Sequence, residues 1–134
     1  MAEILYLKGT MKPEIHTKRV YEEPSVKDGV RVLVDRLWPR GMKKEEVGAE
    51  WAKDLAPSTE LRQWFNHAEP LWPDFEKRYK AELRKNDAVN GFLEEHRHDK
   101  LITLLYGAKD TEHNHALVLK DFMEERLKKG VSFE

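Results

Sequence analysis

The chain has 134 residues, the length of one domain, and its 40% hydrophobic and 10% aromatic content is enough for a packed core. Its formal net charge is −1, and neither half of the sequence has an excess of basic residues large enough to suggest nonspecific electrostatic binding to nucleic acid or anionic lipid. The absence of cysteine excludes disulfides, thiolate nucleophiles and cysteine-based zinc sites.

The first predicted elements are two strands. Residues 14–21 alternate between apolar and polar side chains, which is the pattern of a half-buried strand. Residues 22–29 contain proline and glycine and read as a turn. Residues 30–35 form a β-branched run of the kind found in the middle of a covered sheet.

Three helical segments are predicted next. Residues 43–55 have helical character that Gly48 weakens. In residues 56–67, Ser58 is placed to be the N-cap of a helix. Residues 71–86 carry aromatic and aliphatic side chains at spacings of three and four, which predicts an amphipathic helix.

The last elements are a weaker helix over 88–98, a second buried strand over 101–106 and a long helix over 111–129. Strands separated by helices predict an α/β fold, with a small, mostly parallel sheet of roughly three or four strands covered by about five helices. We expect residues 1–134 to form a single α/β domain. The competing interpretation is an all-helical domain with short extended segments.

Polar loops follow the two buried strands, over residues 35–41 and 107–115. Ligands bind beyond the carboxyl ends of the strands in open parallel sheets, so the two loops would share a cleft if their strands are neighbours. The candidate site residues are Asp35, Arg36, Trp38, Arg40, Tyr106, Lys109, Asp110, His113 and Asn114.

This cleft is predicted to suit a small anion that bears phosphate or carboxylate. Arg36 and Arg40 have planar guanidinium groups whose N–H donors can form paired hydrogen bonds with such a group. The amino end of the last helix adds unpaired backbone N–H groups. Trp38 and Tyr106 could stack on a ring.

The candidate catalytic residues are His113 and Asp35. His113 could carry a proton near neutral pH, and Asp35 could orient it or brace Arg40. No metal site is expected, because His113 and His115 are two residues apart and would point to opposite sides of a helix. No cofactor is expected either, since the sequence has no P-loop and no dinucleotide-binding glycine motif.

Structural roles compete with these assignments. Asp35 could simply form an ion pair with Arg36 or Arg40 that fixes the first loop, and we weigh this equally with a site. Asp110 is favoured as the N-cap of the last helix. His67 could hold a charge at a helix end or merely terminate that helix.

Four segments of the sequence carry a family resemblance. They read "RVLVDRLWPRG", "WAKDLAPSTELRQWF", "FEKRYKAEL" and "LITLLYGAKDTEHNHALVLKDF". In this order they resemble the YeaO-like branch of the domain-of-unknown-function family 488, over residues 14–127. Residues 1–12 look like an extension outside that core.

The resemblance implies a compact α/β domain but supplies no function. Other branches of the family carry a Cys-His-Arg-like motif where this chain has Glu112-His113-Asn114-His115, so thiol chemistry does not transfer to it. Carried over by position, the family signature comprises Asp35, Arg36, Trp38, Pro39, Arg40, Lys53, Pro57, Ser58, Arg62, Trp64, Phe65, His67, Tyr79, Tyr106, Asp110, His113 and Asn114.

We therefore expect a cytoplasmic domain that binds a small anionic ligand, and we leave open whether it is an enzyme. No membrane partner is expected, because no run approaches the ~20 apolar residues that span a bilayer. One alternative is a nucleic-acid-associated or transcription-regulatory module, which the composition disfavours. Another is a homo-oligomeric interaction protein that uses exposed tryptophans. The basic face of the first alternative would comprise Lys43, Lys44, Arg62, Lys77, Arg78 and Lys85.

Overall fold

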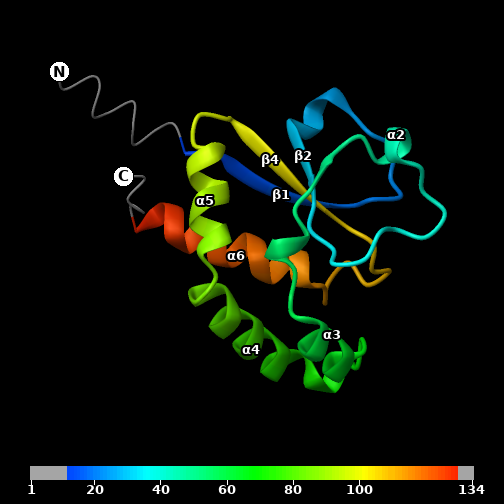
Figure 1. The fold of residues 1–134 in the computed structure, drawn as a ribbon, viewed down its shortest axis with the longest axis vertical. Coiled ribbons are helices and arrows are strands. Elements are labelled where there is room, and N and C mark those ends of the chain that lie inside the picture. The colour runs from blue at the N-terminus through cyan, green and yellow to red at the C-terminus, as the bar shows by residue number, and fades with distance from the viewer. Residues whose placement is uncertain (1–11, 130–134) are drawn as a thin grey trace.

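A computed structural model describes residues 12–129, and its centre is a four-stranded sheet in which every pairing is parallel. The strands lie in the order β1-β4-β2-β3, and three of them are labelled in Figure 1. Their bounds are Glu14–Arg19 for β1, Val30–Leu33 for β2, Glu50–Trp51 for β3 and Leu101–Tyr106 for β4. The predicted α/β fold is confirmed, and the all-helical alternative is wrong.

Five α-helices lie among the described residues, with short 3-10 turns between some of them. The helices are α2 (Lys44–Val47), α3 (Thr59–Phe65), α4 (Trp72–Arg84), α5 (Asp87–Glu95) and α6 (His115–Lys128), and the 3-10 turns are η1 (Val26–Asp28), η2 (Lys53–Leu55) and η3 (Glu69–Leu71). Ser58 accepts a hydrogen bond from the backbone N–H of Leu61, so its predicted role as the N-cap of α3 is confirmed.

The predicted helix over 43–55 is largely wrong. Only Lys44–Val47 is helical, because Gly48 adopts the left-handed conformation at φ 53° and ends the helix. The chain then extends into β3, and the N–H of Ala52 donates to the carbonyl of Leu33 at 2.8 Å. Pairing with β2 therefore overrides the local helical preference of this segment.

The two faces of the sheet are covered differently. Figure 1 shows α3, α4 and α6 gathered on one side of the sheet, while the chain between β2 and β3 loops away from them. Alternate residues of β4, such as Ile102 and Leu104, join the larger core on the helical side with Leu119 of α6. Leu33 and Leu105 belong to a smaller core on the other side. No helix of the described chain is long and apolar enough to cross a bilayer.

The pairing of β2 with β4 positions the candidate site. The N–H of Val34 donates to the carbonyl of Leu105 at 3.0 Å, which continues the ladder past the end of β2. Because the strands are parallel neighbours, their carboxyl ends lie at the same edge of the sheet. The loops that follow them, over 35–41 and 107–114, therefore emerge side by side.

Candidate functional site

The two loops line one cleft with a volume of about 730 Å³. Arg40 of the first loop and His113 of the second both contribute to its wall. A third part of the wall comes from residues 57–69, which include Arg62 and His67. Segments more than 70 positions apart thus meet around a common hollow, as the sheet order requires.

Asp35 connects the two loops. One carboxylate oxygen, Oδ2, accepts a hydrogen bond from the backbone N–H of Gly107 at 2.9 Å. A Cβ at Gly107 would lie 2.9 Å from this same oxygen, so glycine keeps the approach open. The other oxygen, Oδ1, lies 3.1 Å from Nε2 of His115. Asp35 thus fixes the second loop and the start of α6 against the end of β2.

His115 is held by two groups from the end of β2. Its Nε2 lies 2.9 Å from the carbonyl oxygen of Val34, and a carbonyl can only accept, so Nε2 carries the proton. Oδ1 of Asp35 is buried without a hydrogen bond of its own and places its negative charge beside the ring. Asp35 was expected to orient His113 or brace Arg40, but the structure pairs it with His115 instead.

His113 sits in a second pair. Its Nδ1 lies 3.0 Å from Oδ2 of Asp110, and its Nε2 lies 3.9 Å from a carboxylate oxygen of Glu69. The ring also meets the edge of Trp72 at a centroid distance of 5.4 Å. His113 therefore lies between the loop after β4 and the segment that leads into α4.

Asp110 is not the N-cap of α6, contrary to the sequence prediction. Its Oδ1 accepts from the backbone N–H groups of Glu112 and His113, at 2.8 and 3.0 Å. The Glu112 N–H is the main cause that lowers the pKa of Asp110. The cap is Asn114, whose side chain accepts from the N–H of Leu117 at 3.2 Å. Asp110 closes the turn just before the helix, four residues ahead of the position where a cap is needed.

Arg36 has a structural role in the cleft. Its Nε donates to the carbonyl of Pro57 at 2.9 Å, and its Nη2 donates to the carbonyl of Ala56 at 3.3 Å. Arg19 of β1 acts in the same way on the second loop, where its Nε donates to the carbonyl of Ala108 at 2.8 Å. These two guanidinium groups bind backbone and brace the rim of the cleft.

Three other cations line the cleft without such partners. Nε of Arg62 is buried and has no hydrogen-bond partner. Arg40 and Lys109 are exposed, and their side chains form no hydrogen bond or ion pair with any other residue between 12 and 129. Neither Arg36 nor Arg40 pairs with Asp35 within that range, so the alternative of a loop-fixing ion pair is wrong. Three cations of the cleft wall therefore lack a partner among the described residues, and Asp35, Glu69 and Asp110 are the acidic residues of the same wall.

Apolar side chains complete the wall. Leu37 is 59% exposed although it lies in the cleft. Trp38 donates from Nε1 to the carbonyl of Met42 at 2.7 Å and meets the ring of Trp51 edge-on at 5.2 Å. Phe65 is more deeply buried and also contributes. The cleft thus combines cations with apolar surface.

Tyr106 does not line the cleft. It is 3% exposed and belongs to the larger core, and burial raises the pKa of its hydroxyl. The alternation of β4 explains this placement, because Tyr106 points to the same face as Ile102 and Leu104. The expectation that Tyr106 stacks on a ligand ring was therefore wrong.

Sequence reasoning did not place Arg62, His67, Glu69 or His115 in the site. Arg62 lies three residues before the inward-facing Phe65, a spacing that puts both on neighbouring parts of one helix surface. His67 has a left-handed backbone with φ 56°, which is uncommon for a residue other than glycine. Such strained positions are enriched at functional sites. Among the described residues, no group of three or more histidine, aspartate or glutamate side chains could hold a metal ion.

The fold and site define an α/β domain with a cationic, partly apolar cleft beyond the carboxyl ends of two parallel strands. The chain belongs to the DUF488 family, since residues 14–132 match the model described as "Inactive DUF488-N3 subclade".

Two relatives illustrate the likeness. The chain is similar to "Uncharacterized protein YeaO" of Escherichia coli strain K12, with 44% identity over 110 residues that cover 81% of this chain and 96% of that protein. It is also similar to "Uncharacterized protein Rv3073c" of Mycobacterium tuberculosis strain H37Rv, with 37% identity over 114 residues that cover 84% of this chain and 95% of that protein. No solved structure matches.

Proposed function

We propose that this protein binds a small ligand bearing phosphate or carboxylate in the cleft, and that it does so without chemical turnover. The observation that carries the proposal is that the side chain of Arg62 lines the cleft and forms no hydrogen bond or ion pair with any other residue between 12 and 129. A bound anion would supply acceptors for its guanidinium group. Arg40 and Lys109 on the same wall would add to the attraction.

Binding without turnover fits the groups that line the cleft. None of its lining residues among the described part of the chain is serine, threonine or cysteine. His113 and His115 each have a carboxylate beside them, from Asp110 and Asp35, but the described wall offers no serine, threonine or cysteine for either histidine to activate. The word "inactive" in the description of the matching family model agrees with this reading.

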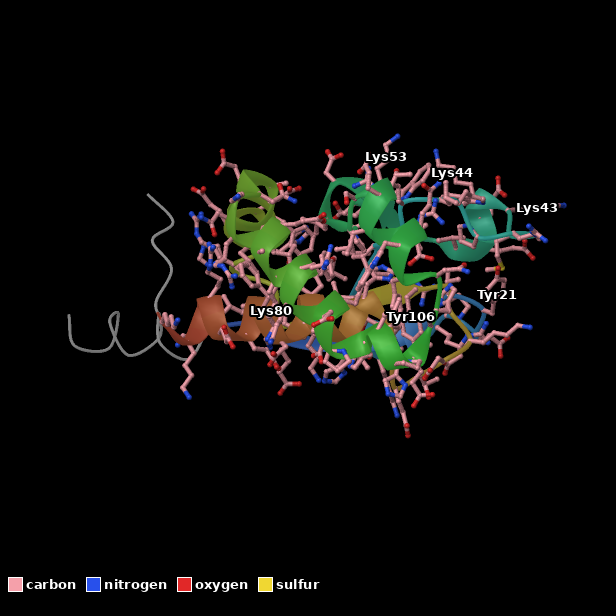
Figure 2. The ribbon with its side chains drawn as sticks, turned by 90° about the horizontal axis from the view of Figure 1, so that it is seen from below. Tyr21, Lys43, Lys44, Lys53, Lys80 and Tyr106 are labelled. Carbon is pink, nitrogen blue, oxygen red and sulfur yellow. The ribbon has the colours of Figure 1, made fainter. Side chains whose placement is uncertain are left out.

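The alternatives receive less support. Figure 2 shows Lys43, Lys44 and Lys53 projecting along one edge of the molecule, but Glu45 and Glu46 stand directly beside the first two in the sequence. Acidic side chains so close to the lysines do not leave the positive surface that nucleic acid requires.

Homo-oligomer formation through exposed tryptophans is equally weakly supported. Trp51 has the ammonium of Lys53 at 5.0 Å from its ring centre, and Trp64 has the guanidinium of Arg78 at 4.4 Å. Both indoles thus already carry a cation on the surface where a second copy would have to dock.

Calorimetric titration with inorganic phosphate at low ionic strength tests the proposal. We expect binding to the native protein and at least tenfold weaker binding to Arg62→Gln, because a hydrogen bond to a charged group contributes about 1.5–3 kcal/mol. Arg40→Gln provides a second variant at an exposed position where folding is not at risk. A parallel titration with acetate separates phosphate from carboxylate recognition.

The matched control is Arg78→Gln, since Arg78 is an arginine outside the cleft that stacks on Trp64. It should bind phosphate as the native protein does. Undetectable binding of both anions at millimolar concentration, or native affinity in both cleft variants, would contradict the proposal.

A further inference from the structure

The cleft is larger than a bare anion needs. Its volume of about 730 Å³ falls within the range of sites that enclose a whole small molecule, roughly 300–1,000 Å³. The three unpaired cations, Arg40, Arg62 and Lys109, account for only part of the wall. The rest of the wall would contact a second part of the ligand, one that is not anionic.

Cations and apolar groups alternate along the same segments of the wall. The first loop carries Leu37 and Trp38 just ahead of Arg40. In α3, Arg62 is followed three residues later by Phe65. An anion held by either arginine would therefore have apolar side chains two or three residues away along the chain.

Leu37 is the clearest sign of an unfilled apolar contact. It is 59% exposed, and it belongs to the wall of the cleft. Burying an exposed leucine against a ligand is favourable, because water is released from the apolar surface.

Trp38 supplies a rigid aromatic wall beside it. The hydrogen bond from Nε1 to Met42 and the edge contact with Trp51 fix the orientation of the indole before any ligand arrives. Pre-organised groups of this kind bind with less loss of conformational entropy. Packing one aromatic ring against another adds interaction energy beyond that of burying apolar surface.

We propose that the ligand of this cleft carries a planar, apolar ring next to its phosphate or carboxylate group. The ring packs against Leu37 and Trp38 while the anionic group pairs with Arg62 and Arg40. This inference rests on the proposed anion binding and adds the part of the ligand that the arginines do not recognise.

Calorimetry with paired probes tests the inference. Phenyl phosphate should bind the native protein at least tenfold more tightly than inorganic phosphate, and benzoate more tightly than acetate. If the two phosphate probes bind more tightly than the two carboxylate probes, the anionic group of the ligand is a phosphate, and in the reverse case it is a carboxylate. Leu37→Ser should remove most of the preference for the ring while it leaves the affinity for inorganic phosphate unchanged.

Val26→Ser is the matched control, because Val26 is fully exposed on η1 and lies outside the cleft. This variant should keep the native preference for phenyl phosphate. Equal affinity for phenyl and inorganic phosphate would overturn the inference and leave anion binding standing, and so would an unchanged preference in Leu37→Ser. If neither phosphate nor carboxylate probes bind, the underlying anion site is wrong.

Discussion

A single buried carboxylate, that of Asp28, joins η1 to two strands. It is 7% exposed, and it accepts hydrogen bonds from the Ser25 N–H and from Lys18 of β1, both at 3.0 Å. Arg31 of β2 donates to it as well, at 2.5 Å. Burial opposes the charge, but the hydrogen bonds of Ser25, Lys18 and Arg31 outweigh that cost and lower the pKa of Asp28 below its ordinary 3.8.

This lowered pKa gives the stability a defined pH dependence. The contribution of Asp28 is fully present above its ordinary, unfolded-state pKa of 3.8 and is lost as the pH falls through the lower folded-state pKa. Asp28→Asn should therefore lower the free energy of unfolding at pH 7 by roughly 2–4 kcal/mol, because Lys18 and Arg31 lose their counter-charge.

Urea unfolding at pH 7 and pH 3 measures this effect. The difference between native protein and Asp28→Asn should shrink at the lower pH, because the carboxyl of the unfolded chain takes up a proton there and the contribution of the Asp28 charge begins to fall. A difference of the same size at both pH values would show that the charge of Asp28 contributes nothing to folding.

Single residues of the site were only partly predictable from the sequence. Asp35 was recognised because it follows a buried strand, but its partner His115 was not. The pairing depends on the helical turn at which α6 begins, and that is fixed by the Asn114 cap. Sequence alone left several capping candidates in the loop, so which histidine faces Asp35 could not be derived.

At the scale of elements, Gly29 controls how η1 leads into β2 beside β4. It has φ 65°, and a Cβ there would lie 2.4 Å from the carbonyl oxygen of Leu101, in the backbone of β4. Gly41 offers a comparison, since it has φ 78° but nothing within 4 Å of the position of a Cβ. Gly29 thus combines a positive φ with a steric conflict, whereas Gly41 has a positive φ and open space around it.

We expect Gly41→Ala to cost about 1 kcal/mol, the ordinary penalty of a left-handed backbone for alanine. Gly29→Ala should cost at least about 3 kcal/mol, because β4 must also shift. Denaturant midpoints of the two variants give both numbers. Similar losses in the two proteins would contradict a close contact between Gly29 and β4.

The elements differ in how far local sequence determines them. β4 was predictable within its observed bounds, because a mainly apolar run of six residues has the length of a strand and is too short for a typical helix. β3 was missed, since it has two residues and exists through hydrogen bonds to β2. Short elements that depend on tertiary pairing carry almost no local signal.

At the scale of the molecule, the larger core joins the sheet to four helices. It includes Val32, Ile102, Phe65, Phe75, Leu93 and Leu119, which come from β2, β4, α3, α4, α5 and α6 in turn. We therefore propose that the chain folds as one domain and expect a single cooperative unfolding transition. Far-UV circular dichroism reports all the helices, whereas tryptophan fluorescence reports only residues 38–72. Coincident transitions by the two probes support one domain, and two separated midpoints would exclude it.

The position of the cleft followed from the sheet, but its composition did not. Two buried runs followed by polar loops were enough to place one edge of a parallel sheet. The part of the wall that includes Arg62 comes from α3, whose position depends on packing among aromatic side chains such as Phe65 and Phe75, with ring centres 4.4 Å apart. Side-chain packing between distant segments is not readable from one sequence.

Arg19 and Arg36 bind main-chain carbonyls, and these contacts do not depend on which side chains the contacted segments carry. This part of the scaffold is therefore independent of the side chains of Leu37, Arg40 and Lys109, which take no part in these contacts. Leu37, Arg40 and Lys109 could be exchanged for other types while the geometry of the rim stays as it is. Descendants of this chain, or engineered versions of it, could acquire new ligand preferences through a handful of surface replacements.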